Sequence, residues 1–244
     1  MISRVANVPA AALPEDSASV MSIGIIVSYD GTPNDEDGLA LGRMLAASGA
    51  TLALAFVRHA REYDPSREEI AQHDANQRLE RGAALLGDPS VARHIVINPS
   101  TGEGLAKLAE SEGASIIAFG SDYRTPPGSV EPGTTAQHLL EGGPVAVAVA
   151  LAGLRTKADA SIASIGVTAP DGETAAQETA DALAAKLGVT ITPGSPIHPD
   201  LIVVGSQLHA PIGEIALGGS TRVELDSAYG SSALVVPRSN PVLF

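Results

Sequence analysis

The sequence contains no cysteine and no tryptophan, and it has few aromatic residues of any kind. Without cysteine, disulfide bonds, thiolate metal ligands and cysteine nucleophiles are excluded. Aromatic residues make up only 3% of the 244 residues, so Ala, Val, Ile and Leu must fill the core. These are the residues that fill parallel sheets covered by helices.

Positive charge is also scarce, because 15 Lys and Arg residues face 28 Asp and Glu residues, a net charge of −13. Such a chain repels polyanions, which argues against nucleic-acid and anionic-membrane binding. The longest apolar runs, such as residues 145–151, fall far short of the ~20 residues that a membrane span needs. We therefore expect no membrane partner.

The first twenty residues lack a signal-peptide core, since Pro9, Pro14, Glu15 and Asp16 interrupt their apolar patch. We expect residues 1–20 to be a flexible extension and the protein to be cytoplasmic. The six histidines show no metal-ligand spacing, and no nucleophile with a base lies beside them, so we expect neither a metal site nor a catalytic residue. In particular, His138, His198 and His209 are expected on the surface or in packing.

Hydrophobic residues make up 44% of the chain and charged residues 18%, a globular composition. In the first half, short apolar runs alternate with helical patterns. The expected strands are residues 23–28, 51–57, 94–97, 114–119 and 145–149. The expected helices run from residue 34 to a stop at Gly49, over 67–86, over 104–112, and from an opening at 133–135.

The second half repeats this pattern in shorter form, with nothing that corresponds to residues 67–86. Its expected strands are 164–168, 189–192, 201–204 and 233–236, with helices over 173–187 and from 219 to near Tyr229. Three dipeptide landmarks recur in order: Asp30-Gly31 with Asp171-Gly172, Gly120-Ser121 with Gly205-Ser206, and Gly133-Thr134 with Gly219-Ser220. A linker is expected near 152–160, which gives domains over 21–151 and 158–241.

Strands that alternate with helices pair in parallel through right-handed crossovers. The sequence therefore predicts an α/β fold with two doubly wound, mostly parallel sheets of the five-stranded type, the second shortened. Ligands of such sheets bind beyond the carboxyl ends of the strands. The first copy places Asp30, Val57 and Gly120 at those ends. At a helix start, Gly133, Thr134 and Thr135 offer backbone N–H groups and hydroxyls to a phosphate.

These residues resemble the universal stress protein family, and the chain resembles a tandem pair of such domains with a degenerate second one. The family carries an Asp after the first strand and the pattern Gly, two residues, Gly, nine residues, then Gly-Ser or Gly-Thr. Gly120 and Gly133-Thr134 match the first and last positions. The resemblance implies an adenine nucleotide α-hydrolase-like fold and binding of ATP or a related adenine nucleotide. The implied binding residues are Asp30, Gly31, Val57 through its backbone, Gly120, Ser121, Tyr123, Gly133, Thr134 and Thr135.

The loop departs from the family pattern. Tyr123 replaces the middle glycine, so its side chain must point away from the ligand or cover it. Three prolines (126, 127 and 132) lack an N–H donor. Asp122 and Glu131 add negative charge, and Arg124 is the only nearby cation. Either Mg²⁺ offsets these carboxylates, or the ligand carries fewer phosphates than ATP.

The second copy departs further, because Leu208 holds the middle position, the glycine spacing is one residue longer, and Pro170 stiffens the turn before Asp171. We expect it to be a structural partner without nucleotide. By resemblance, its closing strand and residues 145–149 should pair as an internal pseudo-dimer, and a homodimer through the closing strands is expected as well.

Three functions remain open. The first is a stress-response or regulatory protein that binds an adenine nucleotide in its first domain with little or no turnover, because no Walker-type Lys is present. The second is a nucleotide-free dimerising scaffold of the same fold. The third is an adenylate-forming enzyme, against which the first loop counts, since it reads Ser28-Tyr29-Asp30-Gly31 instead of a Ser-Gly-Gly-type loop.

Each site feature also has a plainer interpretation. On residue type alone Asp30-Gly31 is more typical of a turn, and the matching Gly120 and Gly133-Thr134 are what favour a ligand there. Residues 133–135 are also typical of an ordinary helix start, and Tyr123-Arg124 of a surface loop. The acidic residues 35–37 are predicted to be a solvated helix start and not a metal site.

Overall fold

A computed structural model of the chain describes residues 24–191, 198–218 and 229–244. In the first half it contains strands β1 (Gly24–Ser28), β2 (Thr51–Arg58), β3 (Ala92–Ile97), β4 (Ala114–Phe119) and β5 (Ala146–Val149). Between them lie helices α1 (Pro33–Ala46), α2 (Pro65–Leu86), α3 (Thr101–Glu112) and α4 (Thr134–Leu139). The alternating order confirms the predicted α/β fold, and the described bounds lie within a few residues of the predicted ones.

The second half is shorter, as predicted. It consists of a 3-10 turn η1 (Leu154–Thr156), β6 (Ser164–Thr168), α5 (Ala175–Leu187), β7 (Thr190–Ile191), β8 (Leu201–Gly205) and β9 (Ser232–Val236). The helix expected from residue 219 lies outside the described residues. Among the residues that the structure does describe, no helix is both long and apolar enough to cross a membrane.

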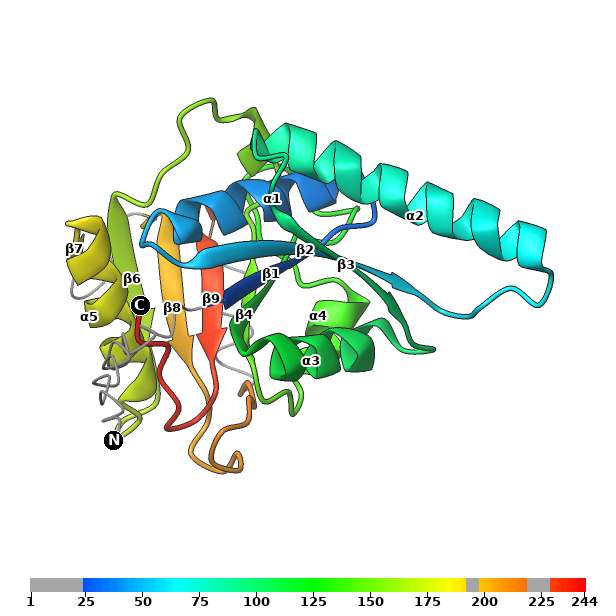
Figure 1. The fold of residues 1–244 in the computed structure, drawn as a ribbon. Helices are drawn as coiled ribbons and strands as arrows, with labels where there is room; N and C mark the ends of the chain where they lie inside the picture. The colour runs from blue at the N-terminus through cyan, green and yellow to red at the C-terminus, as the bar shows by residue number, and fades with distance from the viewer. Residues whose placement is uncertain (1–23, 192–197, 219–228) are drawn as a thin grey trace, which may run out of the picture.

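All described strands join one sheet in the order β3-β2-β1-β4-β5-β9-β8-β6-β7. The two predicted sheets are thus joined edge to edge, through the antiparallel pair β5 and β9 (Figure 1). Helices α1 and α2 cover one face of the first-half strands, and α3 and α4 cover the other (Figure 1). The strands β1, β4 and β5 are almost wholly buried between these layers, which explains their continuous runs of Ile, Val and Ala.

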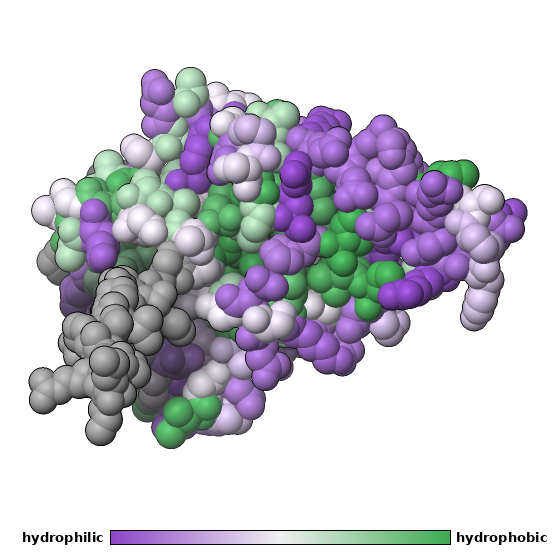
Figure 2. Space-filling view, viewed as in Figure 1, coloured by the Kyte–Doolittle hydropathy of each residue, from purple (hydrophilic) through white to green (hydrophobic). Residues whose placement is uncertain are grey.

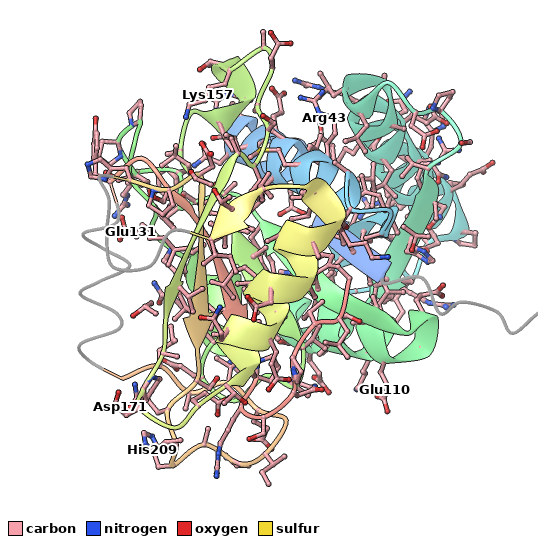
Figure 3. All side chains as sticks on the ribbon, turned by 90° about the vertical axis from the view of Figure 1, so that its left-hand side faces the viewer. Arg43, Glu110, Glu131, Lys157, Asp171 and His209 are labelled. Atoms are coloured by element: carbon pink, nitrogen blue, oxygen red, sulfur yellow. The ribbon has the colours of Figure 1, made fainter. Side chains whose placement is uncertain are left out.

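The closing strands pair with each other inside the chain. On its other edge β5 pairs with β4, and β9 pairs with β8. Each of the two strands therefore has a partner on both edges within the chain, and the homodimer through the closing strands stays a prediction. Because β5 and β9 are antiparallel, the carboxyl edges of the two halves face opposite ends of the sheet. Figure 3 shows Asp171 and His209 together at one end of the second-half strands and Lys157 at the other.

The loops after β4 and β8 repeat the same hydrogen bonds. The Ser121 hydroxyl donates to the Ala150 carbonyl at 2.7 Å, and the Ser206 hydroxyl donates to the Val236 carbonyl at 2.8 Å. One residue further on, the amide of residue 122 donates to the carbonyl of 131, and the amide of 207 donates to that of 216. This agreement extends the sequence landmarks to atomic contacts. The division into two related domains stays a prediction that these contacts favour.

The sequence predicts that the acidic start of α1 is solvated, but the structure shows these side chains in contact with the protein. Asp35 closes a capping box with Thr32, Glu36 forms an ion pair with Arg81, and Asp37 is only 1% exposed. The Asp37 carboxylate accepts hydrogen bonds from the Gly153 amide (2.9 Å), the Arg155 amide (2.7 Å) and the Arg155 guanidinium (2.7 Å). Asp37 thereby ties the segment between the two halves to α1.

The outer surface of α2 is hydrophilic (Figure 2), in keeping with a helix that buries only Ala75, Leu79, Gly82 and Ala83. At its base, the buried Arg58 side chain at the end of β2 pairs with Glu68 at 2.7 Å. This pairing and the amide of Glu62 lower the pKa of Glu68 to about 2. The contact fixes the first turn of α2 against the sheet.

Candidate functional site

A cleft of about 280 Å³ opens where β1 and β4 end and where α1, α3 and α4 begin. Seven of the nine predicted binding residues line it: Asp30, Gly120, Ser121, Tyr123, Gly133, Thr134 and Thr135. The cleft lies at the carboxyl edge of the first half, where β1 and β4 are adjacent in the sheet. Residues up to 108 positions apart in the sequence, Ser28 and Ala136, are thus brought to one concave surface.

Two predicted residues do not line the cleft. Gly31 takes a left-handed backbone conformation with φ of 86°, which makes the turn between Asp30 and the Thr32 cap. Val57 is buried in β2, where its side chain faces Gly104 of α3. Gly31 thus serves the turn and Val57 packs inside the protein, and their part in binding stays a prediction.

The sequence-based prediction missed several residues that line the cleft: Ser28, Thr32, Asn34, Asp35, Thr101, Phe119, Asp122 and Ala136. Asn34 is the most informative of them. Its side-chain amide donates to the Ser121 and Asp122 carbonyls, both at 2.8 Å, and so joins the start of α1 to the loop after β4. The polar cluster at residues 32–35 is a visible signal for this role, but its pattern alone predicts only a helix start.

Asp35 organises the turn beneath the cleft. Its Oδ2 atom accepts from the Asp30 amide (3.1 Å), the Thr32 amide (2.9 Å) and the Thr32 hydroxyl (2.8 Å). Three donors on one carboxylate oxygen hold the Asp30 backbone in place. Asp35, and not the Asp30 side chain, therefore supplies the carboxylate that caps this turn.

Gly120 is needed for packing inside the protein, whatever its part in binding. A Cβ atom at this position would overlap the Asn34 carbonyl group, so glycine is required for α1 to pack on the end of β4. At Gly133, by contrast, a Cβ atom would meet nothing within 4 Å. Only Gly133 leaves open space for a ligand to approach its backbone.

The Ser121 side chain is also committed inside the protein. Its hydroxyl donates to Ala150 and accepts from the Glu131 amide at 3.2 Å, and the residue is only 4% exposed. Tyr123, at the rim, is 71% exposed, and the Arg124 guanidinium lies 4.9 Å from the centre of its ring. Of the two orientations expected for Tyr123, the structure shows the ring turned to solvent and stacked with Arg124.

The Asp30 carboxylate accepts no hydrogen bond from any residue that the structure describes. It is open to solvent at the mouth of the cleft, yet neighbouring protein atoms partly desolvate it. This desolvation raises the pKa of Asp30, and the Asp35 carboxylate adds to the rise, while Arg78 and His59 oppose it. An unpartnered carboxylate held in this way is ready to accept hydrogen bonds from a ligand.

The raised pKa of Asp30 predicts that Asp30→Asn stabilises the free protein at neutral pH. At neutral pH the folded native chain carries the ionised Asp30 carboxylate, which its partly desolvated surroundings disfavour. The stability of the native chain therefore falls as pH rises from the ordinary pKa of 3.8 through the raised pKa. The variant carries no such charge, and its advantage should vanish below about pH 3.8. Thermal melts across this range measure the difference. A variant less stable than the native chain at neutral pH would contradict the prediction.

In the second half, the C-terminal segment packs on the helix that follows β6. Glu173 is buried, and its carboxylate accepts from the Ala175 amide (2.9 Å) and from the Ser239 amide (3.2 Å) in the C-terminal segment. The same segment reaches α5, where the Val242 amide donates to the Thr179 hydroxyl at 2.9 Å. The C-terminal segment thus packs on α5 as the segment after β5, through Gly153 and Arg155, packs on α1.

No group of three or more His, Asp or Glu side chains within the described ranges is arranged to hold a metal ion. The carboxylates beside the cleft have separate surroundings: Asp35 caps α1, and Asp122 accepts from the Arg124 amide at 3.0 Å.

Three comparisons relate the chain to known proteins. A model of the universal stress protein family matches residues 24–150. A search of curated proteins found no match. Among solved structures, a universal stress protein from Archaeoglobus fulgidus DSM 4304 is 16% identical with a TM-score of 0.66, covering 90% of this chain and 100% of that chain.

A putative universal stress protein from Pseudomonas aeruginosa UCBPP-PA14 is 17% identical with a TM-score of 0.55, covering 89% of this chain and 94% of that one. At these identities the likeness establishes the fold alone. A universal stress protein in complex with cAMP is 18% identical with a TM-score of 0.32. The match covers 40% of this chain and 75% of that chain. That likeness is too low to carry its ligand over to this chain.

The family match begins with β1 and ends at Ala150, whose carbonyl accepts the Ser121 hydroxyl. It spans more than half of the 244 residues and includes every residue that lines the cleft. The chain belongs to the universal stress protein family.

Proposed function

We propose that the protein is a stress-response or regulatory protein that binds an adenine nucleotide in the cleft of its first half. The observation that carries this proposal is the convergence of Asp30, the loop after β4 and the start of α4 on one cleft. In parallel sheets, ligands bind at this position beyond the carboxyl ends of the strands. Its volume of about 280 Å³ suits part of a nucleotide.

Each side of the cleft supplies a different chemistry. Asp30 has a carboxylate without a protein partner, which can accept from ribose hydroxyls or a purine amine. The hydroxyls of Thr134 and Thr135 can donate to a phosphate or accept from a sugar, whereas the Thr101 hydroxyl already shares a hydrogen bond with His59 at 3.1 Å. Gly133 is the N-cap residue of α4. No side chain makes a capping hydrogen bond there, and the space beside its Cα is open, so its backbone is accessible. Together these groups match a ligand with a polar sugar between a base and a phosphate.

We expect little or no turnover in the cytoplasm, where the protein would act by binding. None of the residues that line the described cleft is Lys or Arg, which kinases and NTPases use to stabilise a phosphoryl group in transfer. The second half serves in this proposal as a structural partner without nucleotide, because its loop after β8 departs from the family pattern at Leu208.

Calorimetric titration tests the proposal directly. The native chain should bind at least one of adenosine, AMP, ADP and ATP, and Asp30→Ala should bind it about tenfold or more weakly, since a hydrogen bond to a charged group contributes ~1.5–3 kcal/mol. Asp171→Ala is a matched control, because it removes the corresponding carboxylate of the second half. Its affinity should equal that of the native chain.

Two results would count against the proposal. Absence of binding to every adenine nucleotide would favour the alternative, a nucleotide-free scaffold of the same fold. Binding that survives Asp30→Ala with unchanged affinity would place the nucleotide elsewhere.

A further inference from the structure

The loop that borders the cleft, residues 121–132, uses most of its backbone amides internally. Those of Asp122, Arg124, Thr125, Gly128, Ser129 and Glu131 donate to acceptors within the protein. Three further residues of the loop are prolines and have no amide hydrogen. Nine of its twelve residues therefore offer no free backbone donor to a phosphate group. A chain of phosphates needs several such donors, because each carries charged oxygen acceptors.

The internal bonds also hold the loop in its place. The Asp122 amide reaches the Glu131 carbonyl at 2.7 Å, and the Gly128 amide reaches Ala152 at 3.0 Å. From the second half, the Gly230 amide donates to the Gly128 carbonyl at 2.7 Å. To wrap around a polyphosphate, the loop would have to break its hydrogen bonds to Ala152, which follows β5, and to Gly230 of the second half.

The charge of the cleft works in the same direction. Asp30, Asp35 and Asp122 line it, and no Lys or Arg does so. Two arginines lie nearby without lining the cleft. Arg124 stacks on the exposed Tyr123 ring at the rim, and Arg78, whose charge acts on Asp30, lies over the Phe56 ring. Each additional phosphate would bring negative charge toward these carboxylates in a partly desolvated site, where like charges repel more strongly than in water.

From these observations we infer that the cleft selects adenine ligands with few phosphates, adenosine or AMP, over ATP. The inference rests on the proposed function and specifies its ligand. Asp30 accepts from the nucleoside, and the Thr134 and Thr135 hydroxyls beside Gly133 accommodate at most a single phosphate.

Titration of the full chain with adenosine, AMP, ADP and ATP at constant ionic strength, with and without excess Mg²⁺, tests this order. We expect AMP to bind about tenfold or more tightly than ATP, with ADP between them. ATP or its Mg²⁺ complex binding as tightly as AMP, or more tightly, would overturn the inference and leave the proposed function standing. No binding by any of the four would overturn both.

A pair of variants tests the electrostatic cause. Asp122→Asn removes a negative charge from the cleft and keeps the Oδ1 acceptor for the Arg124 amide. This variant should lower the ratio of AMP affinity to ATP affinity about threefold. Glu110→Gln removes the same charge from an exposed position at the far end of α3 (Figure 3) and should leave the ratio unchanged. Equal effects of the two variants would overturn the role of the cleft carboxylates.

Discussion

Gly120→Ala is expected to lower the free energy of unfolding by about 3 kcal/mol or more, whereas Gly133→Ala should change it by less than about 1 kcal/mol. Both glycines belong to the family motif, and both residues line the same cleft. The difference comes from their surroundings. A methyl group on Gly120 would overlap the backbone carbonyl of Asn34, which cannot move without shifting the start of α1 off β4.

Gly133 has no such neighbour within 4 Å, and its φ of −66° suits alanine. Alanine is a poorer helix cap than glycine, but it also restricts the unfolded chain, so the two effects nearly cancel. Thermal melts should therefore show a midpoint about 6–12 °C lower for Gly120→Ala and close to native for Gly133→Ala.

The same pair separates folding from binding. If a ligand approaches the backbone at Gly133, the added methyl group should weaken nucleotide affinity about tenfold in a variant that remains fully folded. Gly120→Ala melting like the native chain would contradict the packing argument. Native affinity in Gly133→Ala would show instead that this face of the cleft is not in contact with ligand.

The alternation of strands and helices was predictable because it depends on local patterns. Short apolar runs mark β1, β4 and β5, which are buried on both faces, and Gly87 and Gly113 end α2 and α3 in left-handed conformations. The start of α2 at Pro65, two residues before the predicted start, depends on the Asp64 cap, a weaker signal within a charged segment.

The functional part of the cleft was predicted less completely, because its contacts join distant residues. Asn34 meets Ser121 across 87 positions, and Thr101 reaches the cleft only because α3 packs beside α4. A glycine in a motif also does not reveal whether a ligand or the protein itself needs the space. At Gly120 the protein needs it, which only the position of α1 could show.

Asp37→Ala is the second substitution with a large expected effect, about 3–5 kcal/mol in the free energy of unfolding. In the native chain, the Arg155 guanidinium and the amides of Gly153 and Arg155 all bind the buried Asp37 carboxylate. The variant removes this acceptor and leaves all three donors without it. We expect the thermal midpoint to fall by about 6–20 °C.

Its neighbour Glu36 provides the matched control. That carboxylate also pairs with an arginine, Arg81 at 2.9 Å, but the arginine side chain is 62% exposed. An exposed pair contributes about 0–1 kcal/mol, so Glu36→Ala should melt within about 4 °C of the native chain. Two adjacent carboxylates, each paired with arginine, should thus differ severalfold in effect because only one is buried.

Arg155→Ala distinguishes the ion pair from the backbone contacts. It removes the guanidinium but leaves the amides of residues 153 and 155 bound to Asp37, so it should cost less than Asp37→Ala. Equal losses from Glu36→Ala and Asp37→Ala would show that burial does not set the strength of this contact. Since Asp37 joins α1 to the segment that leads into β6, its loss should weaken the attachment of the second half. The unfolding transition of Asp37→Ala should then broaden in urea, while that of Glu36→Ala keeps the native slope.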